Sequence, residues 1–317
     1  MKILITGAAG FIGYHLCKSM LREDYEILGI DNLNDYYEKK LKMGRLEILN
    51  KHQNFTFEKI DISEREKLAK SFIKFSPNKV VNLAAQAGVR YSLENPYIYI
   101  ESNISGFLNL IELSRQNNVE GFIYASSSSV YGANKKTPFS IYDRTDNPIS
   151  LYAATKKTNE LIANSYFHLY GLKNTGLRFF TVYGPWGRPD MAYYIFTKKI
   201  LSNTTIDVYN NGNMERDFTY IDDIIEGTKN AIKKNYNNKI FNLGNFNKVK
   251  LIDLIDIIEK ELGKKAKINH MPMQLGDVKE TYADISESIS KLNYKPETSI
   301  QDGLPNFVNW YKKFNNN

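Results

Sequence analysis

Tyr152 and Lys156 stand four residues apart, a spacing that places the phenol and the ammonium group on one face of a helix. A free phenol has a pKa of about 10 and is a poor base at neutral pH, but a neighbouring ammonium favours the phenolate and makes it usable. Serine hydroxyl groups at positions 126–129 follow a predicted strand over residues 121–125. A hydroxyl, a phenol and an ammonium in this arrangement are typical of a site that transfers a hydride and a proton.

The Tyr-x-x-x-Lys spacing by itself is weak evidence, because it recurs three times. The other pairs are Tyr36 with Lys40, Tyr131 with Lys135, and Tyr194 with Lys198, and we interpret each of them as surface helix residues. Only Tyr152 opens a helix-like run, to residue 170, that follows both a strand and a serine cluster. That cluster taken alone fits a polar turn equally well, so the decision rests on the remainder of the chain.

The first residues of the chain predict a phosphate-binding turn between a buried strand at 2–6 and an apolar helix. The turn contains Gly7, Gly10 and Gly13, with Phe11 and Ile12 between the last two glycines. Glycines let backbone N–H groups and a helix N-terminus approach a pyrophosphate. The spacing is Gly-x-x-Gly-x-x-Gly rather than the standard Gly-x-Gly-x-x-Gly, so this match also needs support from its surroundings.

Asp31 supplies such support, because it ends a predicted second strand at 26–30. A carboxylate at this distance from the glycine turn is expected to bind the adenosine ribose of a dinucleotide, with Asn32 beside it. It repels a 2′-phosphate, which favours NAD over NADP. Asp31 as a simple turn residue with Asn32 and Asn34 is the weaker alternative.

Strand-like and helix-like segments alternate to about residue 180, which predicts an α/β fold with a Rossmann-type doubly wound parallel sheet. The later strands are predicted over residues 55–59, 79–83, 121–125 and 175–179. Ligands of such sheets bind beyond the carboxyl ends of the strands. Asp61 and Ile62 are therefore expected near the adenine, and Leu83, Ala84 and Ala85 along the cofactor.

The chain becomes irregular after residue 180, with helices predicted over residues 192–201, 224–234 and 251–262. We predict an NAD-binding domain over residues 1–180, to which part of about 217–247 returns. Residues 181–317 mainly form a smaller, discontinuous C-terminal substrate-binding domain in this prediction.

The composition excludes several other classes. The 42 lysines and arginines exceed the 35 acidic residues by 7, but they are scattered and accompany no nucleic-acid motif. The four histidines lack metal-ligand spacing. The single cysteine, Cys17, permits no internal disulfide. With no membrane-length apolar run and no leader pattern, we expect a cytoplasmic protein without metal, membrane or nucleic-acid partners.

Several segments then resemble one known family, the extended short-chain dehydrogenase/reductases of the nucleotide-sugar epimerase type. They are the glycine turn, the serine cluster, the Tyr152–Lys156 pair and residues 178–185 (RFFTVYGP). Residues 85–92 (AQAGVRYS), 150–156 (SLYAATK), 184–192 (GPWGRPDMA) and 216–223 (RDFTYIDD) closely resemble UDP-glucuronate 4-epimerases. The resemblance spans residues 1 to about 310. It implies a tightly held NAD, UDP-glucuronate and UDP-galacturonate as substrates, and a homodimer joined through helices that include the one carrying Tyr152.

The resemblance also implies roles for the three catalytic candidates. Tyr152 would remove the C4 hydroxyl proton while the C4 hydride passes to the nicotinamide. Ser127 matches the hydroxyl that bridges substrate and phenol. Lys156 would hold the nicotinamide ribose and lower the pKa of Tyr152. The resulting 4-keto sugar would rotate and take the hydride back on its other face.

Further positions match the substrate site of the family. Arg188 and Arg216 match residues that clamp the diphosphate, where a planar guanidinium makes bidentate contacts. Asp277 matches a contact to the uridine ribose. Arg90 is expected near the carboxylate or the phosphates, with a structural salt bridge as the alternative.

The carboxylate of a uronic acid needs its own site, because the 4-keto intermediate is a β-keto acid that loses CO2 easily. Related decarboxylases and dehydratases tend to carry a glutamate where this chain has Ser129. Ser127, Ser128, Ser129 and Thr181 are expected to hydrogen-bond the carboxylate without repelling it. Many epimerases of neutral sugars carry Asn where this chain has Thr181.

Two alternatives stay open. One is a 4-epimerase of UDP-glucose or UDP-N-acetylglucosamine. The other is a non-catalytic NAD-sensing or RNA-binding member of the same fold, although such members commonly lose the tyrosine or the lysine that this chain retains.

Overall fold

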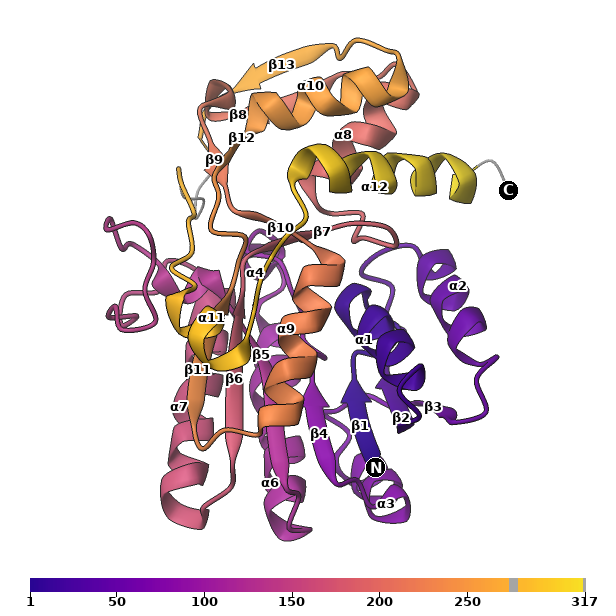
Figure 1. Cartoon of the computed structure of the whole chain (residues 1–317), viewed down its shortest axis with the longest axis vertical. Helices are drawn as coiled ribbons and strands as arrows, with labels where there is room; N and C mark the ends of the chain where they lie inside the picture. Colours follow the sequence, from indigo (N-terminus) through magenta and orange to yellow (C-terminus); the bar gives the residue numbers. More distant parts are fainter. Residues whose placement is uncertain (274–278, 316–317) are drawn as a thin grey trace.

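A seven-stranded parallel sheet forms the centre of the protein, in a computed structural model that describes residues 1–273 and 279–315 (Figure 1). The strands lie side by side in the order β11 (Lys239–Leu243), β6 (Asn174–Phe179), β5 (Gly121–Ser127), β4 (Lys79–Asn82), β1 (Lys2–Thr6), β2 (Glu26–Asp31) and β3 (Phe55–Lys59). The order reverses between β1 and β4, and this switch point is where a doubly wound sheet binds its ligands. The predicted fold class is confirmed.

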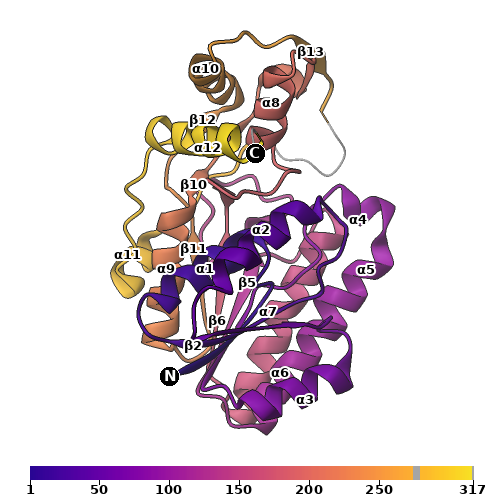
Figure 2. The ribbon, with the colours of Figure 1, turned by 90° about the vertical axis from the view of Figure 1, so that its right-hand side faces the viewer.

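Helices cover both faces of the sheet, as Figure 2 shows. The side chains of β1 illustrate why, because Ile3 and Ile5 enter one core cluster while Leu4 enters the other, and all three are fully buried. The first cluster lies under α1 (Phe11–Leu21), α2 (Lys39–Leu49) and α9 (Ile221–Lys234). The second lies under α3 (Arg65–Phe75), α6 (Phe107–Gln116) and α7 (Leu151–Tyr170).

The chain leaves this sheet after β6 and later returns to it. Helix α9 packs against α1, and β11 pairs in parallel with β6. Both elements fall within the region 217–247 that we expected to return. The division of the chain into two domains at residue 180 stays a prediction.

The smaller part stands above the carboxyl ends of the strands in Figure 1. It contains α8 (Ala192–Leu201), α10 (Leu251–Leu262) and α12 (Ile300–Asn315), with short strand pairs beside them. These pairs are β7 (Thr181–Tyr183) with β10 (Phe218–Tyr220), β9 (Glu215–Arg216) with β12 (Val249–Lys250), and β8 (Ile206–Tyr209) with β13 (Ile268–Met271). Helix α11 (Ser286–Leu292) lies lower, beside α9 and β11.

The segment between β4 and α6 is irregular over residues 83–90 and mainly helical from Tyr91 onward. Helices α4 (Tyr91–Glu94) and α5 (Pro96–Ile100) lead into a π-helix, η1 (Glu101–Gly106), which continues into α6. Two short 3₁₀ helices, η2 (Ser128–Tyr131) and η3 (Asn210–Gly212), follow β5 and β8. In the described part of the chain, no helix has the length and apolar character needed to cross a bilayer.

Three features differ from the sequence predictions. Helix α9 begins three residues earlier than expected, at Ile221, and α12 was not predicted because Gly303 and Pro305 near its start disfavour a helix. The interpretation of Tyr131 and Tyr194 as surface residues is wrong, since both are buried.

Candidate active site

Two adjoining pockets, called here the inner and the outer pocket, open beyond the carboxyl ends of the strands. Every predicted cofactor contact lines the inner pocket: Gly7, Gly10, Phe11, Ile12, Gly13, Asp31, Asn32, Asp61, Ile62, Leu83, Ala84, Ala85, Tyr152 and Lys156. The predicted substrate contacts that the structure describes line the outer pocket: Arg90, Ser127, Ser128, Ser129, Thr181, Arg188 and Arg216. Asp277 lies outside the described residues. The two pockets share Tyr152, Ser127 and Arg188, so they meet at the proposed chemistry.

The glycine turn forms one end of the inner pocket. Gly7 has a φ of +69°, and a Cβ atom there would lie 2.8 Å from the backbone nitrogen of Ala84, which follows β4. A Cβ atom on Gly13 would lie 2.0 Å from the Gly7 carbonyl oxygen. Gly10 is the N-cap of α1 and offers no side-chain cap, and the first turn of this helix contains no acidic residue. The backbone N–H groups at this helix start suit an anion.

Asp31 ends β2 and is held by the backbone around it. Its carboxylate accepts hydrogen bonds from the N–H groups of Ala9, at 3.2 Å, and Leu33, at 2.8 Å. Lys42 lies 3.7 Å from the same carboxylate and donates to the Asn34 side chain at 2.8 Å. Burial lowers the pKa of Lys42, although the charge of Asp31 opposes this shift. This buried lysine was not predicted from the sequence.

Tyr152 lies in the first turn of α7, because Ser150 caps that helix by accepting a hydrogen bond from the Ala153 N–H at 3.1 Å. Lys156 follows one turn later, is 3% exposed, and donates to the Ala125 carbonyl oxygen of β5 at 2.8 Å. Ser127, at the end of β5, accepts a hydrogen bond from the Ser129 N–H at 3.1 Å, which starts the 3₁₀ helix η2. Strand β5 and helix α7 therefore bring the three catalytic candidates together.

The pKa values of Tyr152 and Lys156 are both shifted by burial, and the shift of Tyr152 is opposite to the one predicted from the sequence. Burial lowers the pKa of Lys156 to about 8. Burial also raises the pKa of Tyr152, and the opposing influences are the charge of Arg188 and a hydrogen bond with Ser127. We expected the pKa of Tyr152 to be lowered, but it is raised, because desolvation of the phenol outweighs the charge of Arg188 and the hydrogen bond with Ser127.

A buried ion pair supports this arrangement from below. Glu160, two turns after Tyr152 on α7, accepts two hydrogen bonds from Arg178 of β6, at 2.8 and 2.9 Å. Ser126 also donates to this carboxylate at 2.7 Å. Since Ser126 precedes Ser127, the ion pair ties α7 to β5 and β6 directly beside the catalytic candidates.

Hydroxyl groups and cations share the outer pocket. Ser128 and Ser129 come from η2, and Thr181 comes from β7 on the neighbouring side. The Arg90 guanidinium stacks over the Tyr209 ring, 5.0 Å from the ring centroid. Arg216 donates to the carbonyl oxygens of Glu215, at 2.9 Å, and Lys279, at 3.1 Å.

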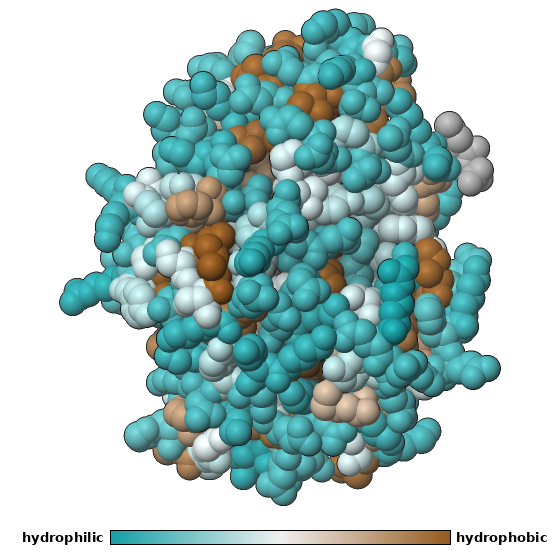
Figure 3. Space-filling view, in the orientation of Figure 1, coloured by the Kyte–Doolittle hydropathy of each residue, from teal (hydrophilic) through white to brown (hydrophobic). Residues whose placement is uncertain are grey.

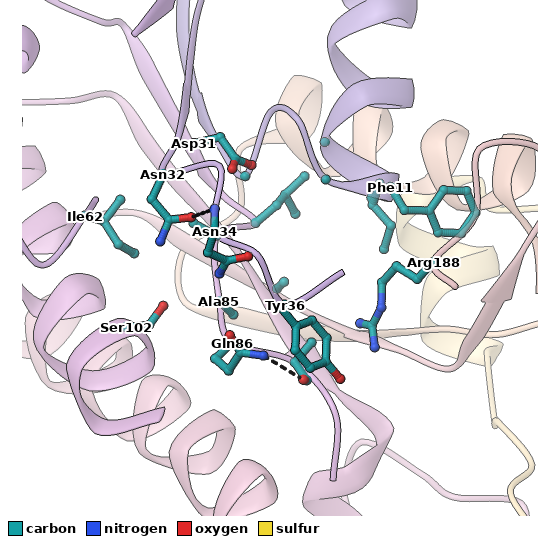
Figure 4. Close-up of a pocket in the computed structure, with 18 of the residues that line it drawn as sticks. Phe11, Asp31, Asn32, Asn34, Tyr36, Ile62, Ala85, Gln86, Ser102 and Arg188 are labelled. Atoms are coloured by element: carbon teal, nitrogen blue, oxygen red, sulfur yellow. Dashed lines mark hydrogen bonds between the residues drawn. The ribbon is translucent and has the colours of Figure 1, made fainter. Parts of the chain in front are cut away.

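Arg188 is bound to Asp190, which the sequence analysis did not single out. The guanidinium donates from Nε at 3.0 Å and from Nη2 to the other carboxylate oxygen. Tyr36 donates to Asp190 at 3.2 Å from the loop after β2. Figure 4 shows Arg188 and Tyr36 close together, with Ile62 and Ser102 at the far side of the pocket. Tyr36, which we interpreted as a surface helix residue, lines both pockets instead.

The described residues of the inner pocket fit NAD. A Cβ atom added at Gly7 or Gly13 would fill the space at the glycine turn. The first turn of α1 contains no acidic residue that would repel a pyrophosphate. The buried carboxylate of Asp31 stands where the adenosine ribose is expected. No cluster of three or more potential metal ligands occurs among the described residues.

A Rossmann groove that ends at a serine, a tyrosine and a lysine defines the short-chain dehydrogenase/reductase class. Within that class, the chain belongs to the NAD dependent epimerase/dehydratase family, whose pattern matches residues 3–244. The chain is similar over 99% of its length to the protein CapI of Staphylococcus aureus, with 52% identity over 99% of that protein.

Two further relatives carry descriptions of activity. UDP-glucuronate 4-epimerase 4 of Arabidopsis thaliana is 48% identical over 99% of this chain and 76% of the plant protein. A crystal structure of UDP-glucuronic acid 4-epimerase from Bacillus cereus, in complex with UDP-glucuronic acid and NAD, superimposes with a TM-score of 0.92. That enzyme is 36% identical, and the match covers 99% of both chains.

Proposed function

We propose that this protein is a UDP-glucuronate 4-epimerase that interconverts UDP-glucuronate and UDP-galacturonate with bound NAD. The observation that carries the proposal is the junction of the two pockets. Tyr152 and Ser127 line both pockets, and the hydroxyl groups of Ser128, Ser129 and Thr181 line the outer pocket. The similar proteins from Bacillus cereus and Arabidopsis thaliana are UDP-glucuronate 4-epimerases, which supports this substrate.

Residues of the inner pocket would hold the cofactor. Gly7, Gly10 and Gly13 would receive the pyrophosphate, Asp31 the adenosine ribose, and Lys156 the nicotinamide ribose. Bound NAD would supply the acceptor and donor for the hydrogen at C4. The positive nicotinamide ring would also favour the Tyr152 phenolate, which the protein charges do not achieve by themselves.

The chain's own groups would move the proton and hold the sugar. Tyr152 would take the proton from the C4 hydroxyl, with Ser127 hydrogen-bonded between sugar and phenol. Arg188 would exchange its Asp190 partner for the diphosphate, where a guanidinium makes bidentate contacts. Arg216 would bind the same group. The proton would return to the oxygen at C4 after the keto sugar has rotated, so the reaction inverts one centre without net oxidation.

The carboxylate site would protect the intermediate. Decarboxylation of a β-keto acid requires the bond to CO2 to align with the ketone π-system. Hydrogen bonds from Ser128, Ser129 and Thr181 would hold the carboxylate out of that alignment, and they would not repel it as a glutamate would. This arrangement favours a uronate over a neutral sugar.

Initial rates with UDP-glucuronate, UDP-glucose and UDP-N-acetylglucosamine test the substrate class. We expect UDP-glucuronate to be turned over at least about tenfold faster, because one charge-assisted hydrogen bond contributes about 1.5 to 3 kcal/mol. Equal rates with the neutral sugars would limit the assignment to a UDP-sugar 4-epimerase. A protein that requires added NADP would contradict the role of Asp31.

We infer a homodimer formed by helices α4 to α7, which lie together on one side of the molecule in Figure 2. Large apolar side chains on these helices are exposed: Leu93, Tyr97, Ile100, Leu108, Leu161 and Leu169. Tyr97 is 81% exposed, whereas the face seen in Figure 3 is mainly hydrophilic. A Tyr97→Asp variant should be monomeric by light scattering, and an unchanged dimer would contradict this interface.

We also propose that the protein is cytoplasmic. Cys17 is fully buried and unpaired, and burial raises the pKa of its thiol. Because a single cysteine cannot form a disulfide within the chain, the fold does not depend on an oxidising compartment.

A further inference from the structure

The segment 184–188, which carries Arg188 into both pockets, has an unfavourable backbone at Trp186. The φ of Trp186 is +62°, in the left-handed region that bulky side chains rarely adopt. A conformation of this kind persists only where the surroundings impose it, and such positions cluster at functional sites. The question is which groups hold this segment in place.

Arg45 of α2 makes two hydrogen bonds to the 184–188 segment. Its side chain is fully buried. Nη2 donates to the carbonyl oxygens of Trp186, at 2.5 Å, and Gly187, at 3.4 Å. Nη1 donates to the carbonyl oxygen of Ala9, in the glycine turn, at 2.7 Å, and to the Tyr37 hydroxyl at 2.8 Å. One planar guanidinium therefore joins the phosphate-binding turn to the residues immediately before Arg188.

Further contacts join the same segment to helices α1 and α2 of the nucleotide-binding part and to α12 of the smaller part. His15 of α1 bonds to the Pro185 carbonyl oxygen at 2.9 Å. The Trp186 ring packs against Trp310 of α12, with ring centroids 5.3 Å apart. A Cβ atom on Gly44 of α2 would lie only 3.0 Å from the Trp186 ring, so the lack of a side chain at Gly44 lets this ring pack closely on α2.

Arg45 acts at a distance from the ligands. It is not among the described residues that line either pocket, whereas Arg188 lines both. Its Nε atom has no hydrogen-bond partner among the described groups, so the side chain is committed to its four backbone and phenol contacts. Any influence on the ligands must pass through the glycine turn, through the 184–188 segment, or through Tyr37, which lines the inner pocket.

We propose that Arg45 is a positioning residue that fixes the Arg188 segment against the dinucleotide turn, and thereby sets the affinity for the diphosphate of the sugar nucleotide. This inference rests on the proposed function, since it assigns Arg188 to that diphosphate. Lysine cannot replace arginine here, because an ammonium lacks the planar fork that reaches both backbone segments.

The test measures UDP affinity by calorimetry, with NAD bound, for wild type, Arg45→Lys, Arg188→Lys and the double variant. We expect Arg45→Lys to weaken UDP binding about 10-fold or more, and to raise KM for UDP-glucuronate while kcat changes less than about 3-fold. The double variant should bind UDP no more weakly than Arg188→Lys does, because Arg45 acts through Arg188.

A milder variant and a control keep the test decisive. Gly44→Ala favours helix α2 but requires the Trp186 ring to shift slightly, so we expect the variant to remain folded and to bind UDP about 3-fold or more weakly. Lys79→Met removes another buried cation, which donates to the Ile232 carbonyl oxygen at 2.6 Å at the opposite end of the sheet. This control should lose stability but retain its UDP affinity.

Two results would overturn the inference. One is unchanged UDP affinity, within about 2-fold, in a folded Arg45→Lys or Gly44→Ala protein. The other is multiplication of the Arg45→Lys and Arg188→Lys effects in the double variant, which would show that they act independently. Because UDP lacks the glucuronate group, these measurements stand even where the wild type proves inactive on UDP-glucuronate, an outcome that would refute the proposed function instead.

Discussion

Replacement of Tyr152 by phenylalanine should separate chemistry from stability. The change removes one oxygen atom, and a hydrogen bond with Ser127 is among the influences that lower the pKa of this phenol. The net value of such a bond is about 1 kcal/mol, which for a chain of this size corresponds to a melting temperature change of about 2 °C. Loss of the acid/base group should lower kcat by about 10²- to 10⁴-fold.

Tyr131→Phe provides the matched control. The Tyr131 hydroxyl donates to the Asn242 side chain at 2.7 Å, where both residues are buried. Removing it leaves the Asn242 oxygen without that donor, at a cost of about 1 to 3 kcal/mol. The control should therefore melt at a lower temperature than Tyr152→Phe and yet interconvert the two sugars at nearly the wild-type rate.

The assay combines NMR progress curves with thermal unfolding and a measurement of bound NAD. Tyr152→Phe should retain its cofactor and its melting temperature while product formation disappears. More than about a tenth of wild-type activity would place the base elsewhere and return attention to Ser127. A large stability loss in Tyr152→Phe would show that inactivity reflects unfolding.

Three further predictions address the carboxylate site, the supporting ion pair and the pH dependence. Thr181→Val should lower kcat/KM for UDP-glucuronate about 10-fold or more and raise the fraction of pentose product seen by NMR, and an unchanged product ratio would contradict the role of Thr181. Glu160→Gln should lower the free energy of unfolding by about 3 to 5 kcal/mol in urea, because Arg178 is then buried without a counter-charge. A loss below about 1 kcal/mol would show that the pair is not coupled to folding. Burial raises the pKa of Asp217 to about 6, so this group stabilises the fold most below about pH 4 and less as pH rises through about 6. As pH rises through this range, the free energy of unfolding of the wild type should fall by about 3 kcal/mol relative to that of Asp217→Asn. A difference that does not change with pH would contradict the burial argument.

Local signals explain why so much of the site was predictable. The glycine turn directly follows β1, Asp31 ends β2, and the serine cluster stands at the end of β5. Parallel strands end at one edge of the sheet. Strand alternation therefore places these motifs together without any knowledge of long-range contacts. The same argument brought Asp61 and Ala84 to the inner pocket.

The parts that escaped prediction depend on contacts between distant segments. Arg45 bonds to Trp186, 141 positions away, and Tyr36 bonds to Asp190, 154 positions away. Nothing near Arg45 in the sequence distinguishes it from a surface arginine on an amphipathic helix. The left-handed Trp186 is equally hidden, because glycine and asparagine, not tryptophan, are the residues that indicate such a turn.

The raised pKa of Tyr152 marks a limit of a different kind. Spacing predicts that Lys156 lowers the pKa of the phenol, but burial of Tyr152 has the larger influence and raises that pKa. In the structure Lys156 itself is 3% exposed, and its ammonium bonds to Ala125. The direction of the pKa shift is therefore decided by the fold and not by the spacing of the two residues.

The central claim is that the hydrogen at C4 leaves the sugar and returns to the same carbon on the opposite face. UDP-glucuronate labelled with deuterium at C4 tests it, in ordinary water and without added cofactor. We predict UDP-galacturonate that keeps the deuterium at C4, with no accompanying pentose nucleotide. Loss of the label to solvent, or a pentose as the main product, would contradict the account.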